Sequence, residues 1–367
     1  MFKLMPLFLI YCVVFMFFAV NDNVDDETVY AQLAENISKG SFVEGDRIWY
    51  GPGYPLFLAP FARFGIYWYW VKAMNIVFLF TASVLVFKMT KNIKLAYIFG
   101  LFPPFFVDML RLLTEPFAVL LATLFCFLFL RNKFFMSGLT FAALIMVKVI
   151  FGYVALAALI FYLLSGNKVF LVYLMALILC LPWLAYTHYK TGKILCFSVS
   201  GGLNLFWMTT SDGYGSWLSP QDTQTKPELA EHKQFFASLE GLSWVDKDDA
   251  LKKEAIKNIT QKPAVYLRNW FCNIGRLFLN FPFSHKLQRP RSLYFIVSNV
   301  LYLAFMVKSR YERGRNVLLN KLALVSFVYL SGISLLAAEA RFLNPIMPML
   351  FLYSVGINKV AIESKIK

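Results

Sequence analysis

Charged residues are scarce in this chain of 367 residues. They make up 16% of the sequence, whereas hydrophobic residues make up 59%. A soluble domain carries roughly 25% charged residues and roughly 45–50% apolar ones. The mean hydropathy is +0.59, and the apolar residues gather in long runs. This composition excludes a soluble enzyme and a disordered protein, and it predicts a polytopic membrane protein.

Cysteine and histidine are also rare. The five cysteines form no Cys-x-x-Cys pair, which excludes the common metal and redox signatures. Three of them lie in apolar runs, so only Cys196 and Cys272 are placed to pair outside the cell. The three histidines are scattered, and no glycine-rich phosphate loop is present. We therefore predict neither a histidine metal site nor a nucleotide site.

Acidic residues are nearly missing from the short breaks between the apolar runs, where only Glu312 and Glu363 occur. The same breaks hold 14 basic residues: Lys3, Lys88, Lys91, Lys94, Arg131, Lys133, Lys168, Lys308, Arg310, Arg313, Arg315, Lys359, Lys365 and Lys367. Cytoplasmic loops of membrane proteins carry such an excess of positive charge. The net charge of +15 is thus explained by membrane orientation, and no nucleic-acid partner is predicted.

Ten apolar runs are candidates to cross a bilayer, for which about 20 residues are needed and somewhat fewer suffice where the bilayer is thin. They cover about 4–20, 71–87, 95–107, 116–130, 134–147, 150–164, 169–186, 292–307, 317–336 and 344–358. The first is read as an uncleaved anchor because no small-residue cleavage site follows it. Placing the basic breaks inside puts both termini in the cytoplasm. The prediction is an all-α, multi-pass protein of the cell (inner) membrane.

This sidedness divides the chain into three parts. They are an N-terminal membrane module at 1–186 with a first outer loop at 21–70, a long outer loop at 187–291, and C-terminal spans at 292–367. Apolar residues at helical spacing predict an amphipathic helix over 26–39 that lies along the membrane surface. The long outer loop is predicted to be mostly helical over 226–281, with a break at Pro263.

Ionisable residues next to the apolar runs are the main functional signal, because a charge at that place is costly to desolvate. On the predicted outer face they are Asp25, Asp26 and Glu27; Asp108, Arg111 and Glu115; Lys148; and Glu339 and Arg341. A carboxylate can accept a proton from a hydroxyl group, and a cation can hold a phosphate leaving group. Gathered on one side, these residues predict a site for a charged, lipid-linked substrate.

Taken singly, the same residues have simpler explanations. Asp26 can cap its helix, Arg111 and Glu115 can form an intrahelical pair, and Arg341 can anchor a span at the headgroups. The tract from Tyr50 to Pro55 predicts a rigid turn that leads toward the membrane. Only the common location of the ionisable residues favours a site.

Several motifs resemble the bacterial GT-C glycosyltransferases, which use polyprenyl-phosphate sugars and are related to the protein O-mannosyltransferases and the lipid A aminoarabinose transferases. The first-loop motifs are Asp26-Glu-Thr-Val-Tyr-Ala31, Gly40 and Tyr50-Gly-Pro-Gly-Tyr-Pro-Leu-Phe-Leu-Ala-Pro60. The later ones are Arg111-Leu-Leu-Thr-Glu-Pro-Phe117, Leu181-Pro-Trp183 through Gly192, Gly201-Gly-Leu-Asn-Leu205, Gly213-Tyr-Gly-Ser-Trp217 and Glu339-Ala-Arg-Phe-Leu-Asn-Pro-Ile-Met-Pro348. The resemblance implies the GT-C membrane fold, with interfacial helices in the first outer loop and an active site away from the cytoplasm.

The resemblance also implies roles for single residues. The catalytic base falls on Asp26, with Asp25 as an immediate competitor, and a second catalytic acid falls on Glu115, which is also the candidate ligand if a divalent cation takes part. Arg341, with Arg111 or Lys148, would bind the lipid phosphate. Tyr50 and Tyr54 would contact sugar or lipid, and Glu27 belongs to the same substrate-binding set.

The implied reaction is transfer of a sugar from a polyprenyl phosphate donor to a hydroxyl group on a lipid, glycan or protein. One alternative is an O-antigen ligase or polymerase, in which outer-loop arginines would dominate. Another is a transporter or flippase of lipid-linked sugars, which would show repeats and charges at the bilayer midplane. A scaffold without chemistry would leave the clustered carboxylates without a use.

Overall fold

The computed structural model describes residues 2–43, 45–211, 218, 222–281, 292–312 and 317–358. Within these residues the chain forms helices and no strand, so the predicted all-α class is confirmed. The motif at 213–217 and the basic residues Arg313, Arg315, Lys359, Lys365 and Lys367 lie outside the described residues.

The described part of the N-terminal half contains eleven α-helices of 7 to 23 residues. They are α1 (Met5–Phe18), α2 (Asp26–Ser38), α3 (Gly53–Arg63), α4 (Trp68–Thr90), α5 (Ile93–Gly100), α6 (Pro103–Met109), α7 (Glu115–Phe129), α8 (Phe134–Val147), α9 (Ile150–Leu164), α10 (Phe170–Leu179) and α11 (Leu181–Thr191). Helix α2 begins and ends within one residue of the predicted surface helix. The turn at Tyr50 is shorter than expected, because α3 already begins at Gly53.

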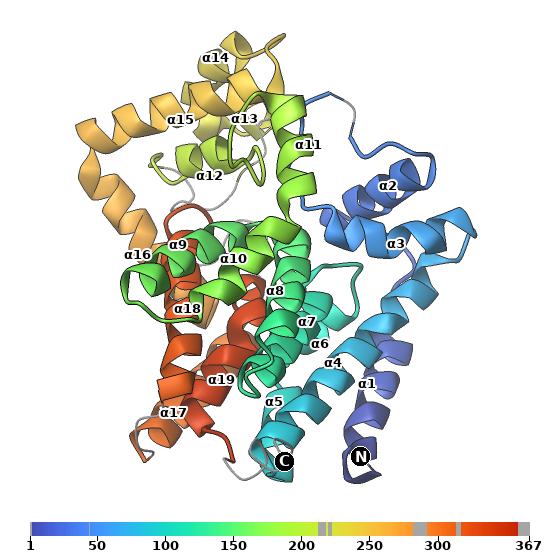
Figure 1. Ribbon diagram of the computed structural model, residues 1–367. Coiled ribbons are helices and arrows are strands. Elements are labelled where there is room, and N and C mark those ends of the chain that lie inside the picture. The colour runs from blue at the N-terminus through green and yellow to red at the C-terminus, as the bar shows by residue number, and fades with distance from the viewer. Residues whose placement is uncertain are drawn as a thin grey trace.

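The second half begins with the helices of segment 187–291, which was predicted to be a long outer loop. They are α12 (Gly201–Trp207), α13 (Asp222–Thr225), α14 (Ala230–Ser238), α15 (Trp244–Gln261) and α16 (Pro263–Leu279), followed by α17 (Ser292–Tyr311), α18 (Val317–Ser334), the 3-10 helix η4 (Ala340–Ile346) and α19 (Met347–Val355). The predicted break at Pro263 is confirmed, because α16 starts there. Helices α12, α14 and α15 lie at the same end of the molecule as α2, and the start of α1 lies at the opposite end (Figure 1).

Among the described residues, α4 and α18 are each long and apolar enough to cross a membrane. Helices α10 and α11 count as a third span if they are taken together, although they are bent by 52°. Shorter apolar helices cover Phe2–Phe18, α7, α8 and α9. These helices are compatible with a membrane protein, and α8 and α9 have the predicted bounds.

The run at 95–107, which was predicted to be a single span, is not one continuous helix. Helix α5 ends at Gly100 and α6 begins at Pro103. Proline lacks the N–H group that would continue a helix and is favoured in the first turn, so Pro103 and Pro104 start a new helix here. The two short helices bring Asp108 into the protein interior, where 3% of its surface is exposed.

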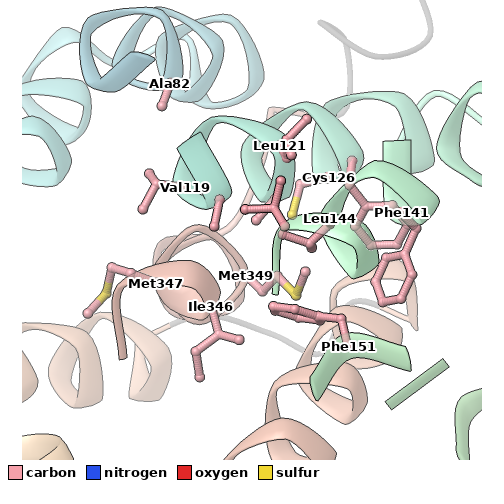
Figure 2. Packing of buried hydrophobic residues seen from close by; sticks show 14 of the residues in the cluster. Ala82, Val119, Leu121, Cys126, Phe141, Leu144, Phe151, Ile346, Met347 and Met349 are labelled. Atoms are coloured by element: carbon pink, nitrogen blue, oxygen red, sulfur yellow. The ribbon is translucent and has the colours of Figure 1, made fainter. Parts of the chain in front are cut away.

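Helix α7 is central to the larger of two apolar core clusters, and the smaller cluster joins α12 to α15. Helix α7 packs against α4, α8, η4 and α19. Figure 2 shows the side chains where these elements meet, with Phe141 of α8 and Phe151 of α9 close to Met349 of α19. Because η4 packs against α7, α6 and α16, this core fixes the segment that carries Arg341. Every cysteine is free, so Cys196 and Cys272 do not pair.

Candidate active site

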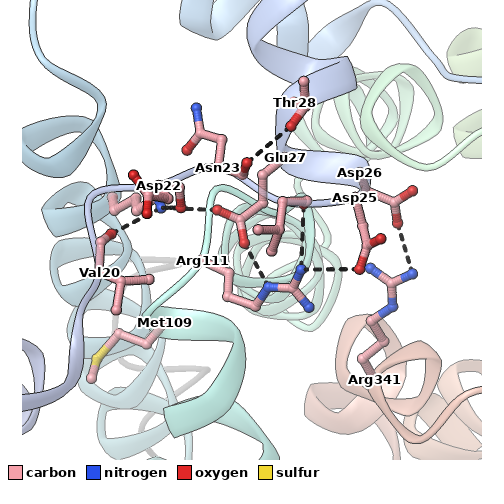
Figure 3. A network of polar contacts seen from close by, with 12 residues as sticks. Val20, Asp22, Asn23, Asp25, Asp26, Glu27, Thr28, Met109, Arg111 and Arg341 are labelled. Carbon is pink, nitrogen blue, oxygen red and sulfur yellow. Dashed lines mark hydrogen bonds and ion pairs between the residues drawn. The ribbon is translucent and has the colours of Figure 1, made fainter. Parts of the chain in front are cut away.

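Asp26 and Arg341 form the centre of the site, although they are 315 positions apart. Asp26 is the first residue of α2, and its Oδ2 accepts a hydrogen bond from Nη2 of Arg341 at 2.7 Å. The other carboxylate oxygen, Oδ1, accepts a hydrogen bond from the Tyr50 hydroxyl at 2.9 Å. Figure 3 shows Arg341 reaching this carboxylate from its own segment of the fold. The fold thus brings three predicted site residues together.

Arg341 is shared by two carboxylates. While Nη2 donates to Asp26, Nε donates to Oε2 of Glu339 at 2.8 Å. The guanidinium also lies over the ring of Phe342, 5.3 Å from its centroid. The side chains of Asp26 and Arg341 are 28% and 21% exposed, so this ion pair remains accessible from outside the protein.

The pKa of Asp26 lies below its ordinary value. Burial favours the neutral acid, but the charge and hydrogen bond of Arg341, the Tyr50 hydroxyl and the charge of Lys148 outweigh it. Burial and the negative charge of Asp26 raise the pKa of Tyr50. At neutral pH, Asp26 is therefore a carboxylate and Tyr50 is a neutral hydrogen-bond donor.

A second ion pair joins Glu115 and Lys148. Glu115 is the first residue of α7 and is 1% exposed. Its Oε1 accepts a hydrogen bond from Nζ of Lys148 at 2.7 Å, and its Oε2 accepts one from the Thr114 hydroxyl at 3.2 Å. Lys148 follows the last residue of α8, and its Nζ lies 5.5 Å from the centroid of the Phe342 ring. Both ion pairs therefore flank one aromatic ring.

Asp108 is a further buried carboxylate near these pairs, and its Oδ2 accepts a hydrogen bond from the side-chain amide of Asn344. The charges of Glu115, Arg341 and Lys148 all act on Asp108. Asn344 is buried, and sequence reasoning did not select it as a site residue. Its place three residues after Arg341 was the available signal, because positions i and i+3 of a helical turn lie on one side.

Glu27, the residue after Asp26, belongs to a different network, which we call the Glu27 clamp and which consists of Glu27, Lys72 and Arg111. Lys72 Nζ lies 2.9 Å from Oε2 of Glu27, and Arg111 Nε lies 2.6 Å from Oε1. Lys72 also donates hydrogen bonds to the carbonyl groups of Val20 and Asp22. The clamp thus fastens the segment that precedes α2 to α4 and to the α6–α7 connection. Figure 3 shows the contact between Glu27 and Arg111.

Two predicted substrate-binding residues are therefore used to hold the protein together. Arg111 does not pair with Glu115, which is bound to Lys148 instead. Glu27 is 2% exposed and cannot reach a substrate without breaking the clamp. Lys72 was not selected from the sequence. A lysine next to an apolar run is the signal that could have found it, because a charge there needs a partner.

Asp25 is more exposed than Asp26 and lies close to a different arginine. It is 61% exposed and lies 3.9 Å from Nη2 of Arg111. Its backbone φ of 51° is positive, but with a ψ of −123° it lies outside the left-handed helical region that aspartate tolerates. Of the two aspartates, Asp26 is the one that contacts Arg341 and Tyr50, so the geometry favours Asp26 as the reactive carboxylate.

The tyrosine tract is held against the end of α8 that carries Lys148. A Cβ atom at Gly51 or Gly53 would lie 2.2 Å or 2.7 Å from backbone atoms of Met146, so only glycine fits at these positions. The Tyr50 ring packs edge-on against Tyr30, with centroids 5.0 Å apart. Tyr54 also packs against Tyr30 but is 2% exposed. Tyr54 is therefore a core residue, and its predicted contact with sugar or lipid does not fit this structure.

In the described part of the chain, no three His, Cys, Asp or Glu residues are close enough together to hold a metal ion. Glu115, the candidate ligand, has both carboxylate oxygens bound to Lys148 and Thr114. The site therefore contains two partly exposed cations. Arg341 is paired with Asp26 and Glu339, and Lys148 is paired with Glu115.

Comparisons with protein-family models, with curated proteins and with solved structures give no match to this chain. Functional inference therefore depends on the chemistry of the site and on the motifs that carry the resemblance.

Proposed function

We propose that this protein is a membrane glycosyltransferase of the GT-C type, which moves a sugar from a polyprenyl phosphate to a hydroxyl group on a lipid, glycan or protein outside the cytoplasm. The observation that carries this proposal is the accessible ion pair between Asp26 and Arg341. A carboxylate that can accept a proton and a guanidinium that can hold a phosphate are the two groups that such a transfer needs. Lys148 adds a second cation beside them.

In the proposed reaction, the acceptor hydroxyl oxygen attacks the anomeric carbon of the donor sugar. A new carbon–oxygen bond forms, while the bond from that carbon to the phosphate oxygen breaks. The phosphate oxygen keeps the bonding electrons, and Arg341 and Lys148 stabilise its negative charge. Asp26 accepts the hydroxyl proton. A single displacement of this kind inverts the configuration at the anomeric carbon.

The proposal includes ten spans, cytoplasmic termini and an extracytoplasmic active site. Contacts at the end of the molecule away from α2 support this orientation. There, the Tyr97 hydroxyl donates a hydrogen bond to the Lys3 carbonyl, and the Asn358 N–H donates one to the Met89 carbonyl. Basic segments that the charge rule assigns to the cytoplasm thus lie side by side, while the clustered carboxylates lie elsewhere.

Sidedness is tested by cysteine labelling in intact cells, with Asp25→Cys and Lys91→Cys introduced into a variant that lacks the native cysteines. Both positions are exposed. A membrane-impermeant maleimide is expected to label position 25 and to reach position 91 only after the membrane is opened. The same labelling at both positions would contradict the proposed orientation.

Activity is tested with the purified full-length protein in lipid nanodiscs. It is given a panel of hexose and pentose polyprenyl phosphates together with an envelope extract as acceptor, and release of free polyprenyl phosphate is measured by mass spectrometry. Release from at least one donor is expected. Intact donors throughout the panel, with folded protein, would contradict the proposal.

A transporter of lipid-linked sugars is the second candidate, and the bend of 52° between α10 and α11 favours it. Broken helices are common in transporters, where they lie at the substrate site. Liposomes with a fluorescent lipid-linked sugar separate the two functions. Movement of the intact lipid between leaflets without sugar release would favour the transporter.

A further inference from the structure

The site holds more carboxylates than cations. Among the ion-paired carboxylates, Asp26 and Glu339 both bind Arg341 and Glu115 binds Lys148, so three carboxylates share two cations. An incoming phosphate adds further negative charge. Its binding is favourable only if one carboxylate gives up its cation, because unpaired like charges at close range repel each other.

In this arrangement, Asp26 is a poor proton acceptor. Both of its carboxylate oxygens already accept hydrogen bonds, one from Tyr50 and one from Arg341. These donors stabilise the charged form and hold the pKa of Asp26 below its ordinary value. The structure thus shows the carboxylate in a form in which it does not readily take a proton from a hydroxyl group.

The two carboxylates that share Arg341 are not equivalent. Glu339 binds Nε and is two positions away in the same segment, so it moves together with Arg341. Asp26 binds Nη2 and belongs to a different helix, whose start is fixed by the Glu27 clamp. The contact with Asp26 can therefore be given up while Glu339 still orients the guanidinium.

Starting from the proposed function, we propose that the donor phosphate displaces Asp26 from Nη2 of Arg341 while Glu339 keeps Nε. The exchange frees Oδ2 of Asp26 to accept the proton of the acceptor hydroxyl. Donor binding thus makes Asp26 available as the base, and the donor therefore binds before the acceptor. Glu339 is a positioning residue, because it acts by holding Arg341.

The test compares binding of farnesyl phosphate, a short polyprenyl phosphate, to the wild type and to Asp26→Asn in nanodiscs at pH 7. An amide carries no charge to compete for Arg341, so the variant is expected to bind about fivefold more tightly, as for loss of an ion pair at a partly exposed site. Farnesol, which lacks the phosphate, is expected to bind both proteins equally. Asp249→Asn removes the carboxylate of the Lys193–Asp249 pair in the outer loop and is expected to match the wild type.

The outcomes test the exchange separately from the proposed function. Tighter binding of farnesyl phosphate by Asp26→Asn, and by Asp26→Ala as a second variant, supports the exchange. Equal or weaker binding by folded variants, with a wild type that transfers sugar, overturns the exchange and leaves the proposed function standing. If the wild type neither binds farnesyl phosphate nor transfers sugar, both proposals fall.

The role of Glu339 is tested by Glu339→Gln in the transfer assay. Loss of a positioning residue is expected to lower kcat about tenfold without raising the KM for the donor, because a competing charge near Arg341 is also removed. A raised donor KM with unchanged kcat would mean that Glu339 binds substrate itself and would overturn its assignment.

Discussion

Asp26 and Glu27 are neighbours at the start of α2, and each binds cations from distant parts of the chain, yet their surroundings differ. Glu27 and Lys72 are 2% and 0% exposed, whereas Asp26 and Arg341 are 28% and 21% exposed. Removing one partner of a buried pair leaves an uncompensated charge in the interior. A partly exposed pair can exchange partners with water or a ligand at little cost. Burial thus distinguishes Glu27, which holds the fold together, from Asp26, which a ligand can reach.

The largest expected effect is on catalysis at Asp26. Asp26→Asn removes the proton acceptor and is expected to lower the transfer rate by about 10²–10⁴-fold, with little change in thermal stability. Asp25→Asn is the matched control, because Asp25 is mostly exposed, and it is expected to keep near wild-type activity. Loss of transfer in Asp25→Asn with activity retained in Asp26→Asn would reverse the assignment.

Next in size is the effect of Lys72→Met on folding. The substitution leaves Glu27 with only Arg111, so the free energy of unfolding is expected to fall by about 3 kcal/mol. Thermal unfolding in detergent measures the change. The double variant Lys72→Met with Glu27→Gln is expected to recover part of the loss, because no buried charge is then left unpaired. An unchanged stability in the single variant would remove the distinction between the two carboxylates.

Lys148→Met is expected to have a smaller effect on the reaction. In the proposal Lys148 stabilises the departing phosphate, so kcat/KM is expected to fall about 10–100-fold. Glu115 is buried, and Lys148→Met with Glu115→Gln therefore serves as a stability control. If the double variant regained full activity, Lys148 would only be neutralising Glu115.

The smallest effect is expected at Asp46, which joins the segment between α2 and α3 to α15. Its carboxylate accepts hydrogen bonds from the backbone N–H groups of Trp244 and Val245. Burial favours the neutral acid, but these N–H groups outweigh it and lower the pKa of Asp46. Asp46→Ala is expected to cost about 1 kcal/mol at pH 7.

The pH dependence of this effect has a definite sign. Because the pKa of Asp46 is lower in the folded protein, its stabilisation is present above the ordinary carboxyl pKa and is lost as the pH falls through the folded value. The stability difference between the wild type and Asp46→Ala is therefore expected to shrink from pH 6 toward pH 3. A difference that stays constant over this range would show that the charge of Asp46 does not contribute.

The sequence was sufficient to predict several of the helices and which charged residues lie near the outer ends of the apolar runs. Periodicity and charge placed a helix at 26–39, close to the observed α2, and apolar runs gave the bounds of α8 and α9. The expectation that Asp26 and Arg341 work together agrees with their contact. These features depend on residues that are near in sequence or on rules that apply to whole segments.

The pairing of charges across the fold could not be predicted from the sequence. Arg111 was assigned to phosphate but binds Glu27, and Lys148 rather than Arg111 binds Glu115. Tyr54 was assigned to substrate but lies in the core. Helical periodicity shows which residues share a face, but it does not show which faces meet between segments far apart in the chain. The break between α5 and α6 was not predicted for a different reason. The apolar run continues through the break, so hydropathy gives no sign of it.

The central claim is that the ion pair of Asp26 and Arg341 lies where the charged head of a lipid-linked donor binds. Photo-crosslinking with a polyprenyl phosphate that carries a photoreactive group next to the phosphate, followed by peptide mapping, tests this most directly. The account predicts labels in the peptides that contain Tyr50 and Arg341, and loss of these labels when unlabelled farnesyl phosphate is in excess. Labels confined to helices α14 and α15, or labels that the competitor does not reduce, would contradict this claim.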